Sequence, residues 1–135
     1  MKEKSIELAK IWSNNPYFDE LDRSEIKTLL EDETTNEVEL IERFHKDLEF
    51  GTGGLRSILG MGSNRMNKYN VRKATQAMAN VVKDSFSGEL AAAVSYDCRK
   101  YSDEFAKEVC MVFAANGIKA YLFTELTPTP MLSYA

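Results

Sequence analysis

Five of the seven glycines in this 135-residue chain lie between residues 51 and 62. Glycine loses more backbone entropy on folding than any other residue, so such a cluster indicates positive φ angles or the close approach of another group to the main chain. Hydroxyl and cationic side chains accompany these glycines: Thr52, Ser57, Ser63, Arg56, Arg65 and Lys68. Because backbone amides and guanidinium groups bind phosphate and carboxylate well, the segment predicts an anion-binding loop. The alternative is that the glycines only shape a turn before a strand at residues 55–59.

Two common glycine motifs do not fit this segment. A dinucleotide-binding fingerprint requires the spacing G-x-G-x-x-G, and Arg56 stands where the third glycine of a motif starting at Gly51 should be. A P-loop requires a lysine directly after its last glycine, and no glycine of the chain is followed by lysine. The sequence therefore argues against nicotinamide and ATP sites of these two kinds.

The composition is that of an ordinary globular domain, with 44% hydrophobic and 28% charged residues. A net charge of −4 argues against a nucleic-acid partner, because such a module needs a basic face. No apolar run is long enough for a membrane span, so we expect a cytoplasmic protein with no membrane partner. Cys98 and Cys110 fit reduced thiols of that compartment. The single histidine, His45, lacks metal-ligand spacing and is expected at a surface or interface, and we assign no metal ligand in this chain.

The first 46 residues contain no glycine and have helical patterning. Apolar positions over Ile6–Trp12 predict a helix that ends before Pro16, because the residue before a proline is pushed out of the helical region. Capping-box spacing over Asp22–Glu25 predicts the start of a second helix. Thr35 or Asn36 is expected to cap a third helix. The residues predicted on its buried side are Val38, Ile41, Phe44 and Leu48.

A fourth helical pattern follows residue 67 and should end near Gly88, which suits a C-cap. Its predicted buried positions are Val71, Ala74, Met78, Val81 and Val82. Arg72 lies in the first turn, where the helix dipole disfavours a cation. Its side chain is therefore either solvated or turned towards an anion near the glycine segment.

The last part of the chain has the pattern strand, helix, strand. Residues 90–96 and 118–123 are short apolar runs with a helical pattern between them. This order predicts a right-handed βαβ unit with a parallel sheet. Because ligands of such sheets lie beyond the carboxyl ends of the strands, we expect function in the loops at 97–100 and 124–130.

Several motifs, taken together and in order, resemble the start of the α-D-phosphohexomutases, and most of all their phosphoglucomutase/phosphomannomutase branch. The first is FGTGGLR at residues 50–56, followed by NRMN at 64–67 and VRKAT at 71–75. YDCR at 96–99, with Ser102, and LTPTP at 126–130 continue the match. The resemblance covers roughly residues 47–135.

The resemblance implies an α/β fold in which helices flank a mixed sheet in three layers, like domain I of the family. Residues 47–135 would form this domain, incomplete at its C-terminus, after an N-terminal helical segment at 1–46. Gly51, Gly53 and Gly54 would shape the loop, and Asp97 with Arg99 would form a structural ion pair more readily than a substrate contact.

The resemblance also implies an intramolecular phosphotransferase, an isomerase of carbohydrate metabolism that interconverts hexose 1-phosphate and hexose 6-phosphate. In the family a phosphoserine, Mg²⁺ and a hexose 1,6-bisphosphate intermediate carry the reaction. Arg56 matches the arginine close to that phosphoserine, and Thr52 is the neighbouring candidate for substrate contact. Family members commonly have glycine after this arginine, where the chain has Ser57.

No serine motif of the family's nucleophile type and no aspartate-rich Mg²⁺ loop occurs in these 135 residues. We therefore expect a truncated domain that is inactive by itself and that works with the remaining domains of the same polypeptide. Glucose, mannose and pentose phosphates stay open as substrates. The alternative function is a non-catalytic phosphate- or protein-binding α/β module.

Overall fold

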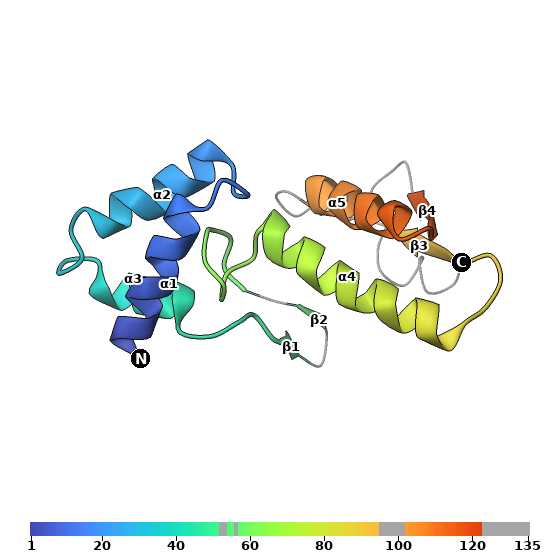
Figure 1. Cartoon of the computed structure of the whole chain (residues 1–135), viewed down its shortest axis with the longest axis horizontal. Coiled ribbons are helices and arrows are strands. Elements are labelled where there is room, and N and C mark those ends of the chain that lie inside the picture. The colour runs from blue at the N-terminus through green and yellow to red at the C-terminus, as the bar shows by residue number, and fades with distance from the viewer. Residues whose placement is uncertain (52–53, 56, 95–101, 123–135) are drawn as a thin grey trace. The chain divides into compact units, whose positions relative to one another are not determined.

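The computed structural model describes residues 1–51, 54–55, 57–94 and 102–122 (Figure 1). The chain divides into two compact units, Met1–Asn70 and Val71–Ala135, which are described separately below. Among the described residues, no helix is both long and apolar enough to cross a membrane.

The first unit begins with three helices, as the sequence predicts: α1 (Lys2–Asn14), α2 (Glu20–Leu30) and α3 (Glu37–Phe44). Helix α1 ends just before Asn15, which has an extended backbone with φ −85° and ψ 118°, as expected for a residue that precedes proline. Asn36 is the N-cap residue of α3, which confirms one of the two predicted positions. The buried side chains that pack these helices together include Ile6, Ala9, Phe18, Ile26, Leu40 and Phe44.

Two predictions about these helices are wrong. Helix α2 begins at Glu20 with Asp19 as its N-cap residue, so the capping box over Asp22–Glu25 does not form. The Glu25 carboxylate instead accepts hydrogen bonds from Arg43 of α3 and from the N–H of Met61 in the glycine segment. These tertiary contacts hold the Glu25 side chain in place of a bond to the backbone of its own helix. Val38 is 81% exposed and does not lie on the buried side of α3, whose buried residues are Leu40, Arg43 and Phe44.

The glycine segment forms a short antiparallel hairpin. Strand β1 (Phe50–Gly51) pairs with β2 (Gly54–Leu55) in the register Phe50↔Leu55 and Gly51↔Gly54. The predicted strand at 55–59 is wrong in its length, because β2 ends at Leu55 and Leu59 makes only an isolated bridge with Met66.

The second unit contains most of α4 (Lys68–Ser85), and then β3 (Ala91–Val94), α5 (Ser102–Ala115) and β4 (Lys119–Leu122). Strands β3 and β4 are parallel, from Ala91↔Lys119 to Val94↔Leu122, which confirms the βαβ unit. A core of Ala79, Val94, Ala106, Phe113 and Ile118 packs the helices against this sheet. The α/β class is thus confirmed, while the three-layer arrangement and the mixed sheet stay predictions.

The predicted buried side of α4 is confirmed in part. Val71 is buried and Val82 packs against the core, as predicted, whereas Met78 and Val81 are 51% and 63% exposed. The buried residues of α4 in this unit are Val71, Thr75 and Ala79, which recur every four residues. The burial of Thr75 was not predicted, and it is possible because the Thr75 hydroxyl donates to the carbonyl of Val71, which removes the cost of burying a polar group. Helix α4 ends at Ser85, near Gly88 as predicted, and Gly88 has a left-handed backbone with φ +85° three residues later.

Candidate functional site

The hairpin Phe50–Leu55 is the candidate site, and the structure describes its base. Gly51 and Gly54 face each other across the two strands. The other residues that the sequence assigns to function, Thr52, Gly53, Arg56, Asp97 and Arg99, lie outside the described residues, as do the loops at 97–100 and 124–130. Their roles stay predictions, and the described part of the site is the framework that carries the hairpin.

Both ends of the hairpin are bound to neighbouring residues of one backbone segment. The N–H of Leu48, before β1, donates to the carbonyl of Ser63 at 2.8 Å. The hydroxyl of Ser57, after β2, donates to the carbonyl of Asn64 at 2.8 Å. Consecutive residues are about 3.8 Å apart, so the two ends of the hairpin are held close together.

This Ser63–Asn64 segment is in turn bound to the C-terminal end of α3. The N–H of Asn64 donates to the carbonyl of Arg43 at 2.9 Å, and its side-chain amide donates to the carbonyl of Glu42 at 3.1 Å. The Ser63 hydroxyl donates to the carbonyl of Lys46 at 2.8 Å. The last carbonyls of a helix have no partner within the helix, so the two bonds from Asn64 cap α3, and all three bonds fix the Ser63–Asn64 segment.

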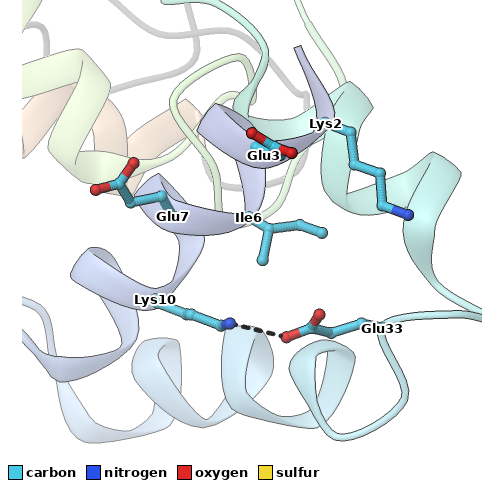
Figure 2. Close-up of a pocket in the computed structure, with 6 residues that line it drawn as sticks. All are labelled: Lys2, Glu3, Ile6, Glu7, Lys10 and Glu33. Atoms are coloured by element: carbon cyan, nitrogen blue, oxygen red, sulfur yellow. Dashed lines mark ion pairs between the residues drawn. The ribbon is translucent and has the colours of Figure 1, made fainter.

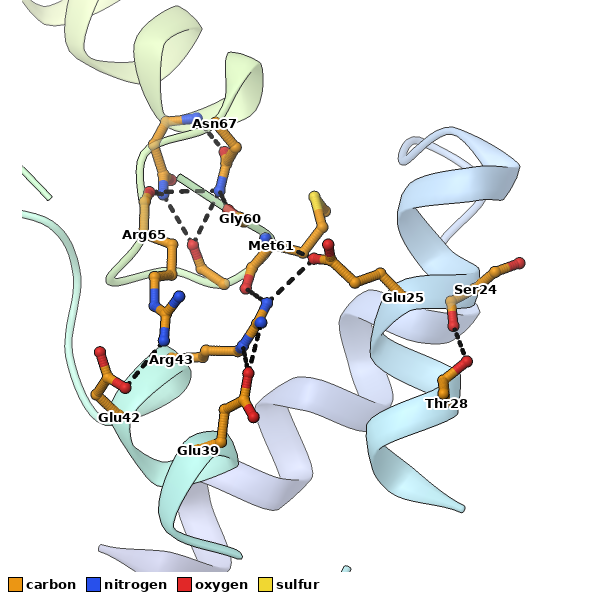
Figure 3. A network of polar contacts seen from close by, with 12 residues as sticks. Ser24, Glu25, Thr28, Glu39, Glu42, Arg43, Gly60, Met61, Arg65 and Asn67 are labelled. Atoms are coloured by element: carbon orange, nitrogen blue, oxygen red, sulfur yellow. Dashed lines mark hydrogen bonds and ion pairs between the residues drawn. The ribbon is translucent and has the colours of Figure 1, made fainter. Parts of the chain in front are cut away.

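Two asparagine side chains bind the backbone carbonyls of residues 60–65, and Figure 3 shows one of them, Asn67. Asn67 donates its side-chain amide to the carbonyls of Gly60 and Gly62 at 2.9 and 3.1 Å. Asn70 donates to the carbonyls of Gly62 and Arg65 at 2.9 and 2.7 Å. The side-chain oxygen of Asn67, directly before α4, also accepts from the N–H of Asn70 at 3.0 Å, in the N-cap manner. The sequence analysis did not predict that Asn67 is an N-cap residue, although an asparagine directly before a helical pattern is a typical sign of one.

Two glycines of the cluster are required by the close approach of α3. Gly62 has φ +140°, and a Cβ atom there would lie 2.6 Å from the carbonyl oxygen of Arg43. Gly60 has φ +145°, and a Cβ atom there would lie 3.2 Å from the Arg43 guanidinium. The prediction of positive φ and close approach is confirmed for both, and the approaching group is helix α3.

The prediction that Arg65 and Lys68 supply cations to an anion pocket is wrong. The Arg65 side chain is 8% exposed and pairs with Glu42 at 2.9 Å. Lys68 forms an ion pair with Asp19, and this hydrogen bond raises the pKa of Lys68 above its ordinary value. Glu42 lies in α3 and Asp19 is the N-cap residue of α2, so neither carboxylate is part of the sequence pattern around the glycines.

The Lys68–Tyr69 step of α4 is bound to the start of α2. The hydroxyl of Tyr69 donates to the carboxylate of Asp22 at 2.6 Å and accepts from the N–H of Asp19 at 2.8 Å. Burial is the main cause that raises the pKa of Tyr69, and its hydrogen bond to Asp22 adds to it. This contact fixes the N-terminal end of α4 within the first unit.

The structure also shows the surroundings of Arg72 and His45, for which the sequence analysis made predictions. Arg72 faces the carboxylate of Glu108, with Nε to Oε2 at 2.6 Å and Nη2 to Oε1 at 3.1 Å. The anion near Arg72 is therefore a side chain of α5. His45 is exposed, as predicted, and its Nδ1 lies 3.0 Å from the carbonyl oxygen of Ile41.

A shallow hollow of about 400 Å³ lies on the surface of the first unit (Figure 2). Its lining is Lys2, Glu3, Ile6, Glu7, Lys10 and Glu33. Lys10 pairs with Glu33 at 3.1 Å, and Lys2 pairs with Glu37 at 3.0 Å. Because carboxylates outnumber ammonium groups in the lining, the hollow does not favour an anionic ligand.

Comparison with family models matches residues 47–135 to the model described as phosphoglucomutase/phosphomannomutase, alpha/beta/alpha domain I. The chain belongs to this family. The match includes the glycine hairpin, its Ser63–Asn64 support and the βαβ unit. It confirms the resemblance drawn from the motifs of the sequence.

Curated relatives carry names of the same kind. The chain is 34% identical to a phosphoglucomutase of Staphylococcus epidermidis over 121 residues, 90% of the chain and 22% of the relative. It is 32% identical to a phosphopentomutase of Mus musculus over 131 residues, 91% and 20% of the two chains. A phosphoribomutase of Saccharomyces cerevisiae is 37% identical over 100 residues, 72% and 16%. The chain thus spans about a fifth of the length of these members of the phosphoglucomutase/phosphomannomutase family, and no solved structure matches it.

Proposed function

We propose that this chain is the first part of a sugar-phosphate mutase, an intramolecular phosphotransferase that interconverts the 1-phosphate and the 6-phosphate of a hexose. The observation that carries the proposal is the family match over residues 47–135, which starts just before the glycine hairpin. The names of the relatives, phosphoglucomutase, phosphopentomutase and phosphoribomutase, support the mutase class.

The proposed chemistry is reversible phosphoryl transfer. A phosphoserine elsewhere in the polypeptide loses its phosphoryl group to a sugar hydroxyl: the P–O bond to serine breaks, the P–O bond to the sugar forms, and the proton lost by the sugar hydroxyl is balanced by the proton that the serine oxygen gains. The bisphosphate intermediate then returns a phosphoryl group from its other end. Catalysis of such a transfer is mostly positioning and electrostatic stabilisation of the equatorial oxygens.

In this proposal the hairpin presents backbone amides and the Arg56 guanidinium to the phosphoryl group, with Thr52 beside them. A guanidinium can form two parallel hydrogen bonds to phosphate oxygens, which fixes orientation as well as charge. Because Arg65 and Lys68 are already paired with carboxylates, the proposal assigns the cationic role to Arg56.

Magnesium belongs to the proposal only at the level of the whole polypeptide. Among the described residues, no group of three or more His, Cys, Asp or Glu side chains could hold a metal ion. We therefore assign no Mg²⁺ ligand here and derive no step through the ion. The remaining domains of the same polypeptide are the proposed source of its ligands, of the phosphoserine and of the sugar-binding loop, and the proposed compartment is the cytoplasm.

The test is mutase turnover of the complete polypeptide that contains these residues, with glucose 1-phosphate, mannose 1-phosphate and ribose 1-phosphate as substrates. The expected result is turnover on a hexose phosphate, while preference for the ribose compound would assign a pentose phosphate. The 135-residue chain serves as the control and is expected to match a mock preparation. Turnover by the 135-residue chain alone would contradict the proposal that the phosphoserine lies outside this chain. Phosphate binding without turnover of any substrate contradicts the mutase and supports a binding module.

A further inference from the structure

The side chain of Arg43 connects helices α2 and α3 with the middle of the glycine segment (Figure 3). Its Nη1 donates to the carbonyl of Met61 at 2.9 Å and to the carboxylate of Glu25 at 3.1 Å. Its Nε and Nη2 donate to one carboxylate oxygen of Glu39 at 3.1 and 2.6 Å. The Arg43 side chain is only 11% exposed, whereas the side chains of Glu25 and Glu39 are 45% and 42% exposed. The guanidinium is therefore shielded from water, and its hydrogen bonds to ionised carboxylates are of the stronger, charge-assisted kind.

The contacts of Arg43, Glu25 and Met61 form a closed ring. Glu25 Oε2 accepts from the N–H of Met61 at 2.8 Å and from Arg43 Nη1, and Arg43 Nη1 donates to the carbonyl of Met61. Both backbone polar groups of Met61 are thus held by side chains from two different helices. The Met61 side chain is buried in the core of the same helices.

Met61 lies between Gly60 and Gly62, two glycines with positive φ, and its backbone is held by the ring of hydrogen bonds. A Gly-x-Gly sequence has unusual backbone freedom, so its conformation depends on what holds the central residue. Beyond it, Asn67 and Asn70 gather the carbonyls of the glycine segment. The Ser63–Asn64 segment then holds Leu48 and Ser57, the two ends of the hairpin.

From this chain of contacts we propose that Arg43, aligned by Glu25 and Glu39, is a positioning residue that fixes the glycine hairpin for the mutase reaction. The helices before residue 47 thereby belong to the support of the active site. The catalytic part of this inference rests on the proposed function, whereas the structural part does not. Arg43 touches neither substrate nor the reacting phosphoryl group in this proposal, and acts through Met61 and the Ser63–Asn64 segment.

The structural part is tested by amide hydrogen exchange of the 135-residue chain with Arg43→Met, a replacement that keeps length and removes the donors. The amides of Leu48, Met61 and Met66 should exchange about tenfold faster or more. The acceptors of Leu48 and Met66 are the carbonyls of Ser63 and Ile58, in the stretch that Arg43 no longer holds, and the acceptor of Met61 is the Glu25 carboxylate of the ring. The amide of Ala9, in the core of α1, should change by less than about twofold.

Lys10→Met is the matched control, since it removes an exposed ion pair with Glu33 on the same unit. It should leave the exchange rates of the glycine segment unchanged. Glu25→Gln is the milder variant if Arg43→Met does not fold, and it should accelerate exchange at Met61 most of all. Unchanged exchange at Met61 in a folded variant of either kind overturns the inference.

The catalytic part is tested by turnover of the complete polypeptide. Arg43→Met should lower kcat about tenfold or more, because small misplacement of a catalytic group is costly, and should change KM by less than about threefold. Arg43→Lys should recover part of kcat by keeping the charge. Faster exchange with unchanged kcat overturns the positioning role. Absence of turnover in the unmodified polypeptide instead refutes the proposed function, and the exchange experiment then decides the structural part alone.

Discussion

Replacing Gly62 with alanine is expected to destabilise the first unit by more than the same replacement at Gly60. The two glycines have nearly the same backbone conformation, with φ +140° and +145°. They differ in what a new Cβ atom meets. At Gly62 it meets the Arg43 carbonyl oxygen at 2.6 Å and the Arg43 Cβ at 2.8 Å, both fixed in α3. At Gly60 it meets the movable end of the Arg43 side chain at 3.2 Å.

The magnitude follows from two separate costs. Holding a non-glycine residue at positive φ costs about 1–2 kcal/mol, and both variants bear this cost. Forcing an extra carbon into closely packed backbone costs about 1–3 kcal/mol more, and only Gly62→Ala bears this one. The expected loss in free energy of unfolding is therefore about 2–5 kcal/mol for Gly62→Ala and about 1–2 kcal/mol for Gly60→Ala.

The assay is urea unfolding followed by the fluorescence of Trp12, the single tryptophan of the chain. Trp12 stacks on Phe18 with ring centroids 4.4 Å apart and meets Phe44 edge-on at 5.4 Å, so its signal reports the core of the first unit. With a slope of about 1–3 kcal/mol per molar urea, the midpoints of the two variants should differ by about 1 M. Equal midpoints, or a lower midpoint for Gly60→Ala, would refute the described contact between Gly62 and α3.

Three other outcomes are expected. In the complete polypeptide, Arg56→Ala should slow mutase turnover by about 10²-fold or more, as loss of one preorganised charge stabiliser does, and turnover within about twofold of the unmodified enzyme would remove Arg56 from the site. The raised pKa values of Lys68 and Tyr69 mean that their stabilising contribution is complete below their ordinary values of 10.5 and 10.0 and is lost as the pH rises through the folded-state values. Urea midpoints should thus fall above pH 10 and fall less in Tyr69→Phe, and an unchanged alkaline slope in that variant would contradict the assignment. Hydrogen bonds from Thr35 lower the pKa of Asp32 below 3.8, and an NMR titration of Thr35→Ala should show this pKa moving upward, whereas no movement would disprove the cause.

Local signals of the sequence predicted the elements well where the cause is itself local. The end of α1 before Pro16, the N-cap position at Asn36 and the left-handed Gly88 each depend on one or two neighbouring residues. The βαβ unit follows from two apolar runs separated by a helical pattern, and it is confirmed in the parallel register of β3 and β4. Motif order was sufficient to identify the family.

The predictions that are wrong depend on partners distant in the sequence. Glu25 has the spacing of a capping residue, but the buried guanidinium of Arg43, 18 positions later, attracts its carboxylate instead. The sequence analysis treated Arg65 and Lys68 as free cations, because the carboxylates that pair with them lie 23 and 49 positions earlier in the chain. Tertiary pairing of this kind leaves no trace in local spacing. The roles of Thr52, Arg56, Asp97 and Arg99, and the division at residues 46 and 47, stay predictions.

The tethering of the hairpin at Leu48 and Ser57 has a consequence for how such a chain can diverge. Leu48 and Ser57 are bound to two adjacent carbonyls, those of Ser63 and Asn64, so residues outside the hairpin set where the chain enters and leaves it. Substitutions between Leu48 and Ser57, or even a change in the length of this stretch, leave the attachment to α3 intact. Under the proposed function, the residues that face the phosphoryl group could therefore change during divergence while the helices that hold the hairpin stay the same.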